Sequence, residues 1–346
     1  MIDLELKLKN FLSVREANLK SKNNITILIA PNRAGKTQIM LLIYSIFWSF
    51  WKISKENLGK DKRYFESTLK RKLKDTFLLK SVGELKSWNA ETYSVKLNSQ
   101  YITISFLGFS DKFILQEFSI KDSKFFEFLR KSPLYMQLSG LGDYYKGIHS
   151  LKKYYPNWKL ISEAITDLLS DLFIISSENM ETDKENKELL SLFEKLFDSK
   201  FYIQEKRIYI QEKEKKYGIE KTASGLKSLS WYYLILKYNL IGNILFIDEP
   251  EVNLHPVYID RLAEFLYKLS RGRKVFIATH SDYLLESFNK LMSKNNFKID
   301  VWKGVLEQGG AIYSCYEADK DNLIDTSPLT EVYLNILREG FGYEGV

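Results

Sequence analysis

Residues 244–256 read Ile244-Leu-Phe-Ile-Asp-Glu-Pro-Glu-Val-Asn-Leu-His-Pro256, and the rest of the chain is interpreted outward from here. The first four residues are apolar and predict a short, fully buried strand. Asp248 and Glu249 follow at its carboxyl end, and a proline ends the strand. In open parallel α/β sheets, ligands bind outside the carboxyl ends of the strands. The pair therefore predicts a site for a metal ion and a reacting water, with an acidic turn as the plain alternative.

A second stretch joins a buried strand to a helix through a Gly-Lys-Thr loop. Residues 25–29 are β-branched and apolar, the loop is Ala30-Pro-Asn-Arg-Ala-Gly-Lys-Thr37, and an apolar run follows. This is the context of a phosphate-binding P-loop, in which the helix N-terminus offers N–H groups to phosphate. Lys36 can then reach the β and γ phosphates, and the Thr37 hydroxyl can ligate Mg²⁺. The alternative is a chance Gly-Lys-Thr, since Ala30 replaces the first glycine of the pattern.

Apolar and polar residues alternate over residues 2–9, which predicts a half-buried strand, and residues 11–19 predict a second one. Ser224 and Gly225 stand where an N-cap is expected, before an apolar helix. His280 follows another buried strand. Further strands are expected at 93–97, 101–106, 113–118, 133–137 and 274–278, a hairpin at 201–212, a loop at 176–187, and helices at 125–130, 158–173, 188–197, 228–238 and 257–269.

Composition indicates a folded protein with a substantial core, because 45% of residues are hydrophobic and 14% aromatic. The single cysteine, Cys315, excludes an internal disulfide and a thiolate metal cage. The apolar run at 39–51 is too short to cross a bilayer, and the N-terminus is not a signal peptide. We therefore expect a soluble, cytoplasmic protein with no membrane partner. The net charge of +7 and the basic residues 60–74 are compatible with nucleic acid, although such a run is more often the solvated face of an amphipathic helix.

The order of these motifs resembles the ABC-type ATPase heads of the RecF/SMC/OLD group. A P-loop comes first, then Ser224-Gly225, a strand that ends in Asp248-Glu249, and a strand that ends in His280. The opening Lys9-Asn-Phe-Leu-Ser-Val is also similar, and the likeness is greatest to small AAA-type ATPases related to the ATPase half of OLD proteins. Those relatives are associated with plasmid or phage defence.

The resemblance implies an α/β fold, that of a P-loop NTPase of the ABC-ATPase head type. Its mixed sheet would carry an antiparallel β subdomain and a helical subdomain. One domain would span residues 1–346. Its first lobe, about 1–175, would hold the P-loop and a basic helical insertion at 52–90. Its second lobe, about 200–346, would hold the signature, the Walker B strand and the switch histidine.

The resemblance also implies roles for single residues. Asp248 would hold Mg²⁺ together with Thr37, and Gln137 is the candidate Q-loop ligand of the metal. Glu249 would act as general base, and Lys36 and His280 would contact the γ phosphate as catalytic residues. The residues implied to bind ATP are Asn32, Arg33, Ala34, Gly35, Lys36, Thr37 and Gln38, completed by Ser224 and Gly225.

Ser224 and Gly225 would act in trans, on ATP bound to a second copy of the chain. The implied assembly is a homodimer that sandwiches ATP, with larger oligomers left open, and residues 253–255 would form the D-loop between its two sites. The 66 residues after His280 are too few for the nuclease module of OLD proteins, so an effector such as a nuclease or toxin is expected on another polypeptide.

Three functions remain open from the sequence. The first is a Mg²⁺-dependent ATPase that dimerises through ATP and controls a separate effector, in prokaryotic antiviral or plasmid defence. The second is a RecF-like DNA-binding maintenance or repair factor that ATP closes on duplex DNA, motivated by the basic residues 60–74. The third is a nucleotide-binding scaffold with slow or no hydrolysis, because Ala30 and Arg33 replace glycines common in this loop.

Overall fold

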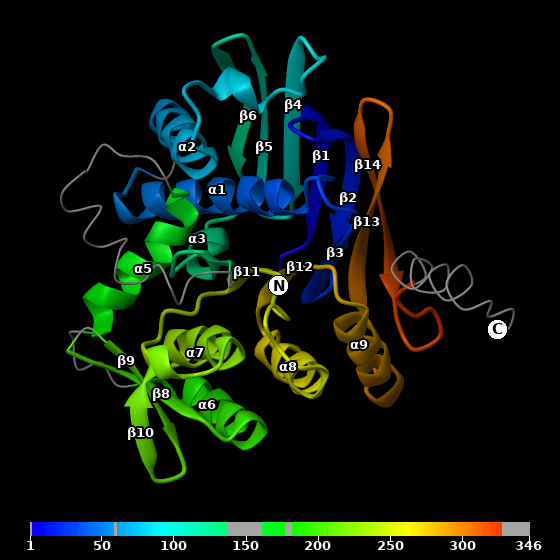
Figure 1. Cartoon of the computed structure of the whole chain (residues 1–346). Helices are drawn as coiled ribbons and strands as arrows, with labels where there is room; N and C mark the ends of the chain where they lie inside the picture. The colour runs from blue at the N-terminus through cyan, green and yellow to red at the C-terminus, as the bar shows by residue number, and fades with distance from the viewer. Residues whose placement is uncertain (1, 59–60, 138–160, 177–181, 206, 327–346) are drawn as a thin grey trace, which may run out of the picture.

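One mixed sheet of eleven strands organises the computed structural model, which describes residues 2–58, 61–137, 161–176, 182–205 and 207–326 (Figure 1). In sheet order, the strands are β6 (Lys112–Ile120), β5 (Ile102–Phe109), β4 (Thr92–Ser99), β1 (Leu4–Phe11), β2 (Val14–Ser21), β14 (Gly310–Ala318), β13 (Ile299–Glu307), β3 (Ile25–Ile29), β12 (Lys274–Thr279), β11 (Ile244–Asp248) and β7 (Leu134–Gln137).

The sheet has an antiparallel part and a parallel part. Strands β6, β5, β4, β1 and β2 pair antiparallel with one another. Strands β13, β3, β12, β11 and β7 pair parallel, so their carboxyl ends meet at one edge. β14 joins the two parts, antiparallel to β13 and parallel to β2. The mixed sheet with an antiparallel subdomain, predicted from the sequence, is confirmed.

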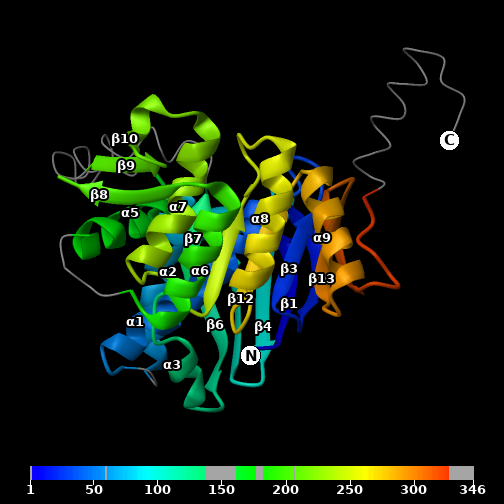
Figure 2. The same cartoon turned by 90° about the horizontal axis from the view of Figure 1, so that it is seen from below.

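Helices cover both faces of the parallel part. Along β3, Ile25, Ile27 and Ile29 enter one apolar core and Leu28 enters the other, as expected for side chains that alternate across a strand. The helices that contribute to the first core include α7 (Ser224–Lys237), α8 (Pro256–Leu269) and α9 (Asp282–Lys294), and Figure 2 shows α8 and α9 against the sheet. None of the described helices is long and apolar enough to cross a membrane.

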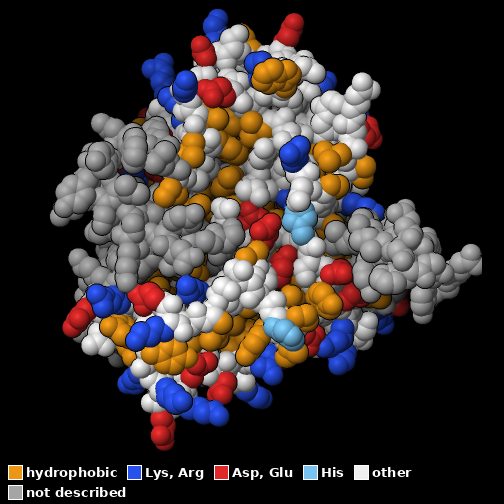
Figure 3. All heavy atoms as spheres, viewed as in Figure 1, with side chains coloured by type: hydrophobic (Ala, Val, Ile, Leu, Met, Phe, Trp, Pro, Cys, Tyr) orange, Lys and Arg blue, Asp and Glu red, His pale blue; other side chains and the backbone are white. Residues whose placement is uncertain are grey.

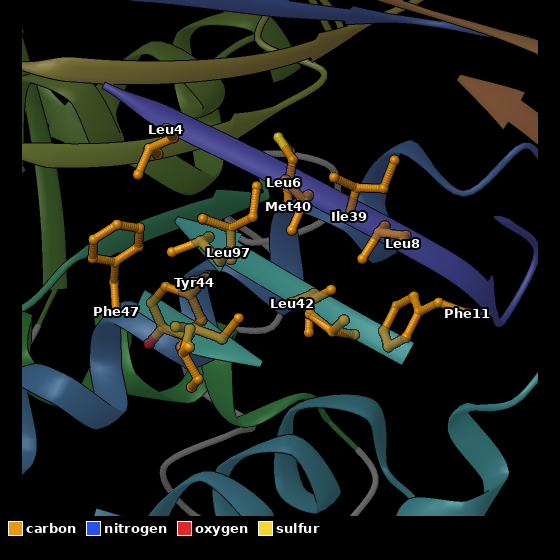
Figure 4. Close-up of a cluster of buried hydrophobic side chains, with 14 of the residues drawn as sticks. Leu4, Leu6, Leu8, Phe11, Ile39, Met40, Leu42, Tyr44, Phe47 and Leu97 are labelled. Carbon is orange, nitrogen blue, oxygen red and sulfur yellow. The ribbon is translucent and has the colours of Figure 1, made fainter. Parts of the chain in front are cut away.

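The second core is built around α1 (Lys36–Lys55), the helix that follows the P-loop. Figure 4 shows side chains of β1 and β4, such as Leu6 and Leu97, gathered with Ile39 and Phe47 of this helix. All four side chains have no exposed surface, and burying each contributes about 1.5–3 kcal/mol relative to exposure. Both the strand before the P-loop and the helix after it are therefore anchored in apolar cores.

A helical subdomain lies beside α7. It contains α6 (Lys184–Phe197) and a small antiparallel sheet of β8 (Lys200–Gln204), β9 (Arg207–Glu212) and β10 (Lys215–Gly218), whereas α5 (Glu163–Ser176) packs against β7, α1 and the helix at Lys62–Phe77. The hairpin at 201–212 is confirmed, whereas β10 was not predicted. Residues 158–160 of the predicted helix 158–173 lie outside the described residues.

Two predicted boundaries were wrong for local reasons. Residues 184–187 belong to α6 rather than to a loop, because the Asp183 side chain accepts a hydrogen bond from the Asn186 N–H and caps the helix. The second strand begins at Val14 rather than at residue 11, because Leu12 adopts a left-handed backbone conformation in a turn. Both features are single-residue effects that a periodic pattern does not show.

The basic segment forms α2 (Lys62–Phe77). A 3₁₀ turn at Val82–Leu85 and the short helix α3 (Lys124–Phe128) follow it in the chain. The predicted amphipathic character is confirmed, because α2 buries a stripe of its residues. Lys72 is an exception among its basic residues, since it has no exposed surface and pairs with Glu163 and Asp167 of α5. Lys60 lies outside the described residues.

Candidate nucleotide-binding site

The P-loop depends on a glycine just before α1. Gly35 has φ of 91°, a left-handed conformation that favours glycine. A Cβ there would lie 2.9 Å from Gln38 Oε1 and 3.0 Å from Val14 Cγ2. Gln38 is also engaged, because its Oε1 accepts a hydrogen bond of 3.1 Å from the Ser13 N–H. Gln38 therefore ties the start of α1 to the turn between β1 and β2.

The two departures from the usual loop glycines behave differently. Arg33 has φ of 68°, a conformation that costs a non-glycine residue about 1–2 kcal/mol. Ala30 is not among the residues with positive φ, and its methyl group is buried. A Cβ on Gly304 of β13 would lie 2.8 Å from the Ala30 Cβ. The alanine is therefore accommodated by a glycine on the neighbouring strand.

Lys36 is held at the mouth of this loop. Its Nζ donates a 2.7 Å hydrogen bond to the Ala30 carbonyl and lies 2.6 Å from His280 Nε2. Burial lowers the pKa of Lys36 to about 8, against the opposing charges of Asp248 and Glu249. Burial and the Lys36 charge also lower the pKa of His280. We assign a neutral His280 whose Nε2 accepts a hydrogen bond from the Lys36 ammonium group, so the strand end at His280 and the P-loop lie in contact.

Asp248 lies beside Thr37. Its Oδ2 accepts hydrogen bonds from Thr37 Oγ1 at 2.7 Å and from the Tyr135 hydroxyl at 2.9 Å. Burial raises the pKa of Asp248, and the two hydrogen bonds oppose this shift. A carboxylate and a hydroxyl side by side are oxygen ligands of the type that Mg²⁺ takes. The residues present therefore fit the metal implied by the resemblance.

Tyr135 is a site residue that the sequence analysis missed. It lies in β7, which pairs with β11 in a register that sets Phe246 opposite Tyr135 and Asp248 opposite Gln137. That register brings Gln137 to the predicted edge of the sheet, next to Asp248, and the residues after Gln137 lie outside the described part of the chain. Alternation marks Tyr135 as a buried strand residue, but no sequence signal names its partner 113 residues away.

Glu249 begins the turn that follows β11. Its backbone is left-handed, with φ of 51°, and its N–H donates to the Ala278 carbonyl at 2.9 Å. The Val252 N–H returns to the Glu249 carbonyl at 3.2 Å, and the side chain of Glu249 is half-buried. Acidic and histidine side chains gather near the middle of the face shown in Figure 3. A carboxylate beside Asp248 that solvent can reach is suited to accept a proton from water.

The structure places Ser224 and Gly225 as the first two residues of α7, with Ala223 as the N-cap, so the predicted capping role was wrong. Ser224 is exposed, and in the described chain no hydrogen bond connects it to the Lys36 loop. A Cβ on Gly225 would lie 2.7 Å from the Asn253 carbonyl oxygen. The predicted signature and D-loop therefore touch within one chain. His255 of that segment caps α8, its Nδ1 accepting from the Val257 N–H at 3.4 Å.

One known family of protein domains matches part of this chain in sequence. Residues 219–286, which run from just before Ser224 to just after His280, match the sequence model of the family described as "AAA domain, putative AbiEii toxin, Type IV TA system". That match covers about a fifth of the chain. A search of curated protein sequences found no significant match.

Three solved structures share the fold over most of their length. An SMC head bound to the C-winged helix domain of ScpA has a TM-score of 0.53 and 14% identity, over 90% of this chain and 97% of that one. An SMC head domain from Thermotoga maritima has a TM-score of 0.51 and 15% identity, over 91% and 98%. An Smc head domain with an extended coiled coil, bound to the C-terminal domain of ScpA from Pyrococcus furiosus, has a TM-score of 0.51 and 13% identity, over 98% and 99%.

The fold is that of an SMC-type P-loop ATPase head. Together with the family match, it supports an ATPase domain of the ABC/SMC type, the class that the motif order predicted. The narrower resemblance to OLD-related ATPases stays a prediction, as do the roles of the single site residues.

Proposed function

We propose that this chain is a Mg²⁺-dependent ATPase that sandwiches ATP between two copies and thereby controls a separate effector protein. The convergence of Lys36, Thr37, Asp248 and His280 at one edge of the sheet carries this proposal. Phosphoryl transfer to water needs positioning and charge neutralisation more than covalent chemistry. A bound Mg²⁺ supplies positive charge on the phosphate oxygens.

The chain's own residues divide the remaining work. Lys36 and the N–H groups at the start of α1 bind the β and γ phosphates, and Asp248 with Thr37 holds the metal. Glu249 accepts the proton of the attacking water, and His280 contacts the γ phosphate after Lys36 turns from its Nε2. The exposed Ser224, which makes no hydrogen bond to its own P-loop in the described chain, completes the site of the second copy.

The control of an effector is supported by two comparisons. The matched family is described with the words toxin and TA system, and two of the SMC heads that share the fold are bound to a domain of ScpA, a separate protein. On this support we propose a role in prokaryotic antiviral or plasmid defence, with a nuclease or toxin as the effector class.

The first experiment measures phosphate release by the wild-type chain and the mass in solution of Glu249→Gln protein, with and without ATP-Mg²⁺. We expect turnover in the wild type, and in the variant no turnover but an ATP-dependent increase in mass. Lys36→Ala is the matched control. It should show neither phosphate release nor an ATP-dependent increase in mass. Binding of ATP without turnover in the wild type would contradict hydrolysis and favour the scaffold function; unchanged mass would contradict the sandwich.

The RecF-like alternative makes a distinct prediction. The exposed side of α2 carries Lys62, Arg63 and Arg71, which could contact phosphates of duplex DNA. DNA binding that strengthens with ATP and weakens steeply with salt would favour this function. An absence of binding at about 50 mM salt, where phosphate contacts are strong, would exclude it.

A further inference from the structure

Glu251, two residues beyond the proposed base, contacts the residue pair at the end of β12. Its Oε1 accepts a 2.6 Å hydrogen bond from the Thr279 hydroxyl and a 3.2 Å hydrogen bond from the backbone N–H of His280. The Thr279 hydroxyl in turn accepts from the Ser281 N–H at 3.0 Å. Glu251 Oε1 therefore holds the backbone of Thr279 and His280 in place, and with it the position of the His280 side chain.

The segment that carries Glu251 is itself held in place. Its two tight turns are closed by hydrogen bonds from Val252 to Glu249 and from Leu254 to Glu251. On the other side of Thr279, the Ser281 side chain caps α9 by accepting from the Leu284 N–H at 3.2 Å. Glu251 thus connects two rigid elements, the turn after β11 and the start of α9.

The second oxygen of the Glu251 carboxylate lacks the hydrogen bonds that a purely structural role would provide. Glu251 Oε2 is buried and has no hydrogen-bond partner among the described residues. Burial raises the pKa of Glu251, while the hydrogen bonds from Thr279 and His280 oppose the shift. Burying a carboxylate with one oxygen unpaired is unfavourable. Packing alone therefore does not explain why a glutamate occupies this position. The two hydrogen bonds that Oε1 accepts do explain it.

We propose that Glu251 is a positioning residue for ATP hydrolysis, which acts by holding His280 in the orientation that meets Lys36 and the γ phosphate. The role of His280 in this inference rests on the proposed ATPase function. Glu251 itself need not touch the nucleotide. Its contribution is geometric, and misplacement of a reacting group by about 1 Å can cost on the order of a hundredfold in rate.

The histidine content of the chain permits a direct test without nucleotide. There are three histidines in the sequence, so the His280 signal in a spectrum of ¹³C-histidine-labelled protein is assigned by its loss in His280→Ala. We expect Glu251→Ala to move the His280 signal and to leave the His255 signal in place. Glu251→Gln keeps a carbonyl oxygen for the two donors, so its His280 signal should stay near the wild-type position. An unmoved His280 signal in folded Glu251→Ala overturns the proposal.

A kinetic cycle tests the same link in the presence of ATP. We expect Glu251→Ala to lower kcat roughly tenfold or more with little change in ATP affinity, and Glu251→Gln to restore most of it. Placed in the His280→Ala background, Glu251→Ala should have almost no further effect, because residues that act as a unit are not additive. Independent, multiplying losses would overturn the proposal.

Two outcomes separate this inference from the proposed function. A wild-type chain without turnover would refute the ATPase, while the nucleotide-free spectrum would still show whether Glu251 sets the position of His280. If Glu251→Ala does not fold, Thr279→Val removes one of the two donors at nearly constant volume. It should then move the His280 signal away from its wild-type position, and an unmoved signal would overturn the proposal.

Discussion

At the scale of single residues, the site is held together by polar groups that share one acceptor. Asp248 Oδ2 receives both the Thr37 and the Tyr135 hydroxyl, and Glu251 Oε1 receives two donors from the end of β12. Hydrogen bonds to charged groups are worth about 1.5–3 kcal/mol each. Removing one donor should therefore change the site measurably without unfolding the protein.

Replacing Tyr135 with phenylalanine removes one of the two hydroxyls on Asp248 and keeps the buried ring. We expect apparent Mg²⁺ affinity in the ATPase assay to fall about tenfold, because the carboxylate loses a fixed orientation. ATP binding without metal should be unchanged, which titration with and without Mg²⁺ measures. Equal Mg²⁺ dependence in Tyr135→Phe and the wild type would show that Thr37 alone positions Asp248.

Asp171 on α5 should make stability depend on pH. Burial first, and then the charge of Asp167, raise the pKa of Asp171 from 3.8 to about 6. The folded protein therefore holds this proton more tightly than the unfolded chain, and the stabilisation it gives at low pH is lost as the pH rises through about 6.

We expect Asp171→Asn to be more stable than the wild type at pH 8, by about 1–3 kcal/mol, with a smaller difference at pH 5. Urea unfolding of both proteins at the two pH values checks this. A difference that does not change with pH would mean that Asp171 is not protonated more readily in the folded state.

At the scale of elements, the contact of α7 with the turn after β11 joins two motifs of the site. Gly225 lies at this contact, because a Cβ on it would be 2.7 Å from the Asn253 carbonyl oxygen, too close for a side chain. The side chains of α7 farther along are buried in the same core as those of α8. A change at Gly225 must therefore move either the helix start or the D-loop.

Gly225→Ala places a methyl group 2.7 Å from a backbone oxygen, and we expect a loss of about 1–3 kcal/mol in stability. ATP-dependent dimerisation should weaken as well, because Ser224 and the D-loop shift together. Thermal unfolding and light scattering measure the two effects. Ser224→Ala is the control, since the exposed first position of the helix should tolerate it without loss of stability, and an equally stable Gly225→Ala would contradict the contact.

At the scale of the whole molecule, the proposed dimer separates the P-loop and the signature of each working site onto two chains. In a symmetric two-fold dimer, each chain then contributes to both sites. A variant that lacks Lys36 can still supply Ser224 to its partner, and a variant blocked at Ser224 can still supply Lys36. Mixing the two variants therefore tests whether Lys36 and Ser224 of each site come from different chains.

Lys36→Ala and Ser224→Arg should each be inactive alone, and a mixture should recover up to about half of wild-type turnover, because each mixed dimer has one intact site and one site that lacks both residues. Phosphate release from the mixed and separate proteins measures the recovery. The double variant mixed with wild type is the control for simple dilution. No recovery in the mixture would show that Ser224 does not act in trans.

The local parts of the fold were predictable because their causes lie within a few residues. The strand at 25–29, the loop with Gly35 and the following helix were all identified, since turn chemistry and apolar runs are local signals. The β4–β5–β6 meander was identified from alternation in the same way. The start of α6 and the turn at Leu12 escaped because one cap and one left-handed residue moved each boundary.

The order of motifs in the sequence was enough to predict the class of site. A P-loop, a strand that ends in Asp-Glu and a strand that ends in histidine can all lie at the same edge of one parallel sheet. The sequence did not contain the partnerships between them. Lys72 is fully buried between α1, α2 and α5 although its segment reads as a solvated basic face. Tyr135 and Glu251 bind groups 113 and 28 residues away. Such contacts arise only when segments distant in sequence pack together, because hydrogen bonds act over about 3 Å and folding alone brings those atoms that close.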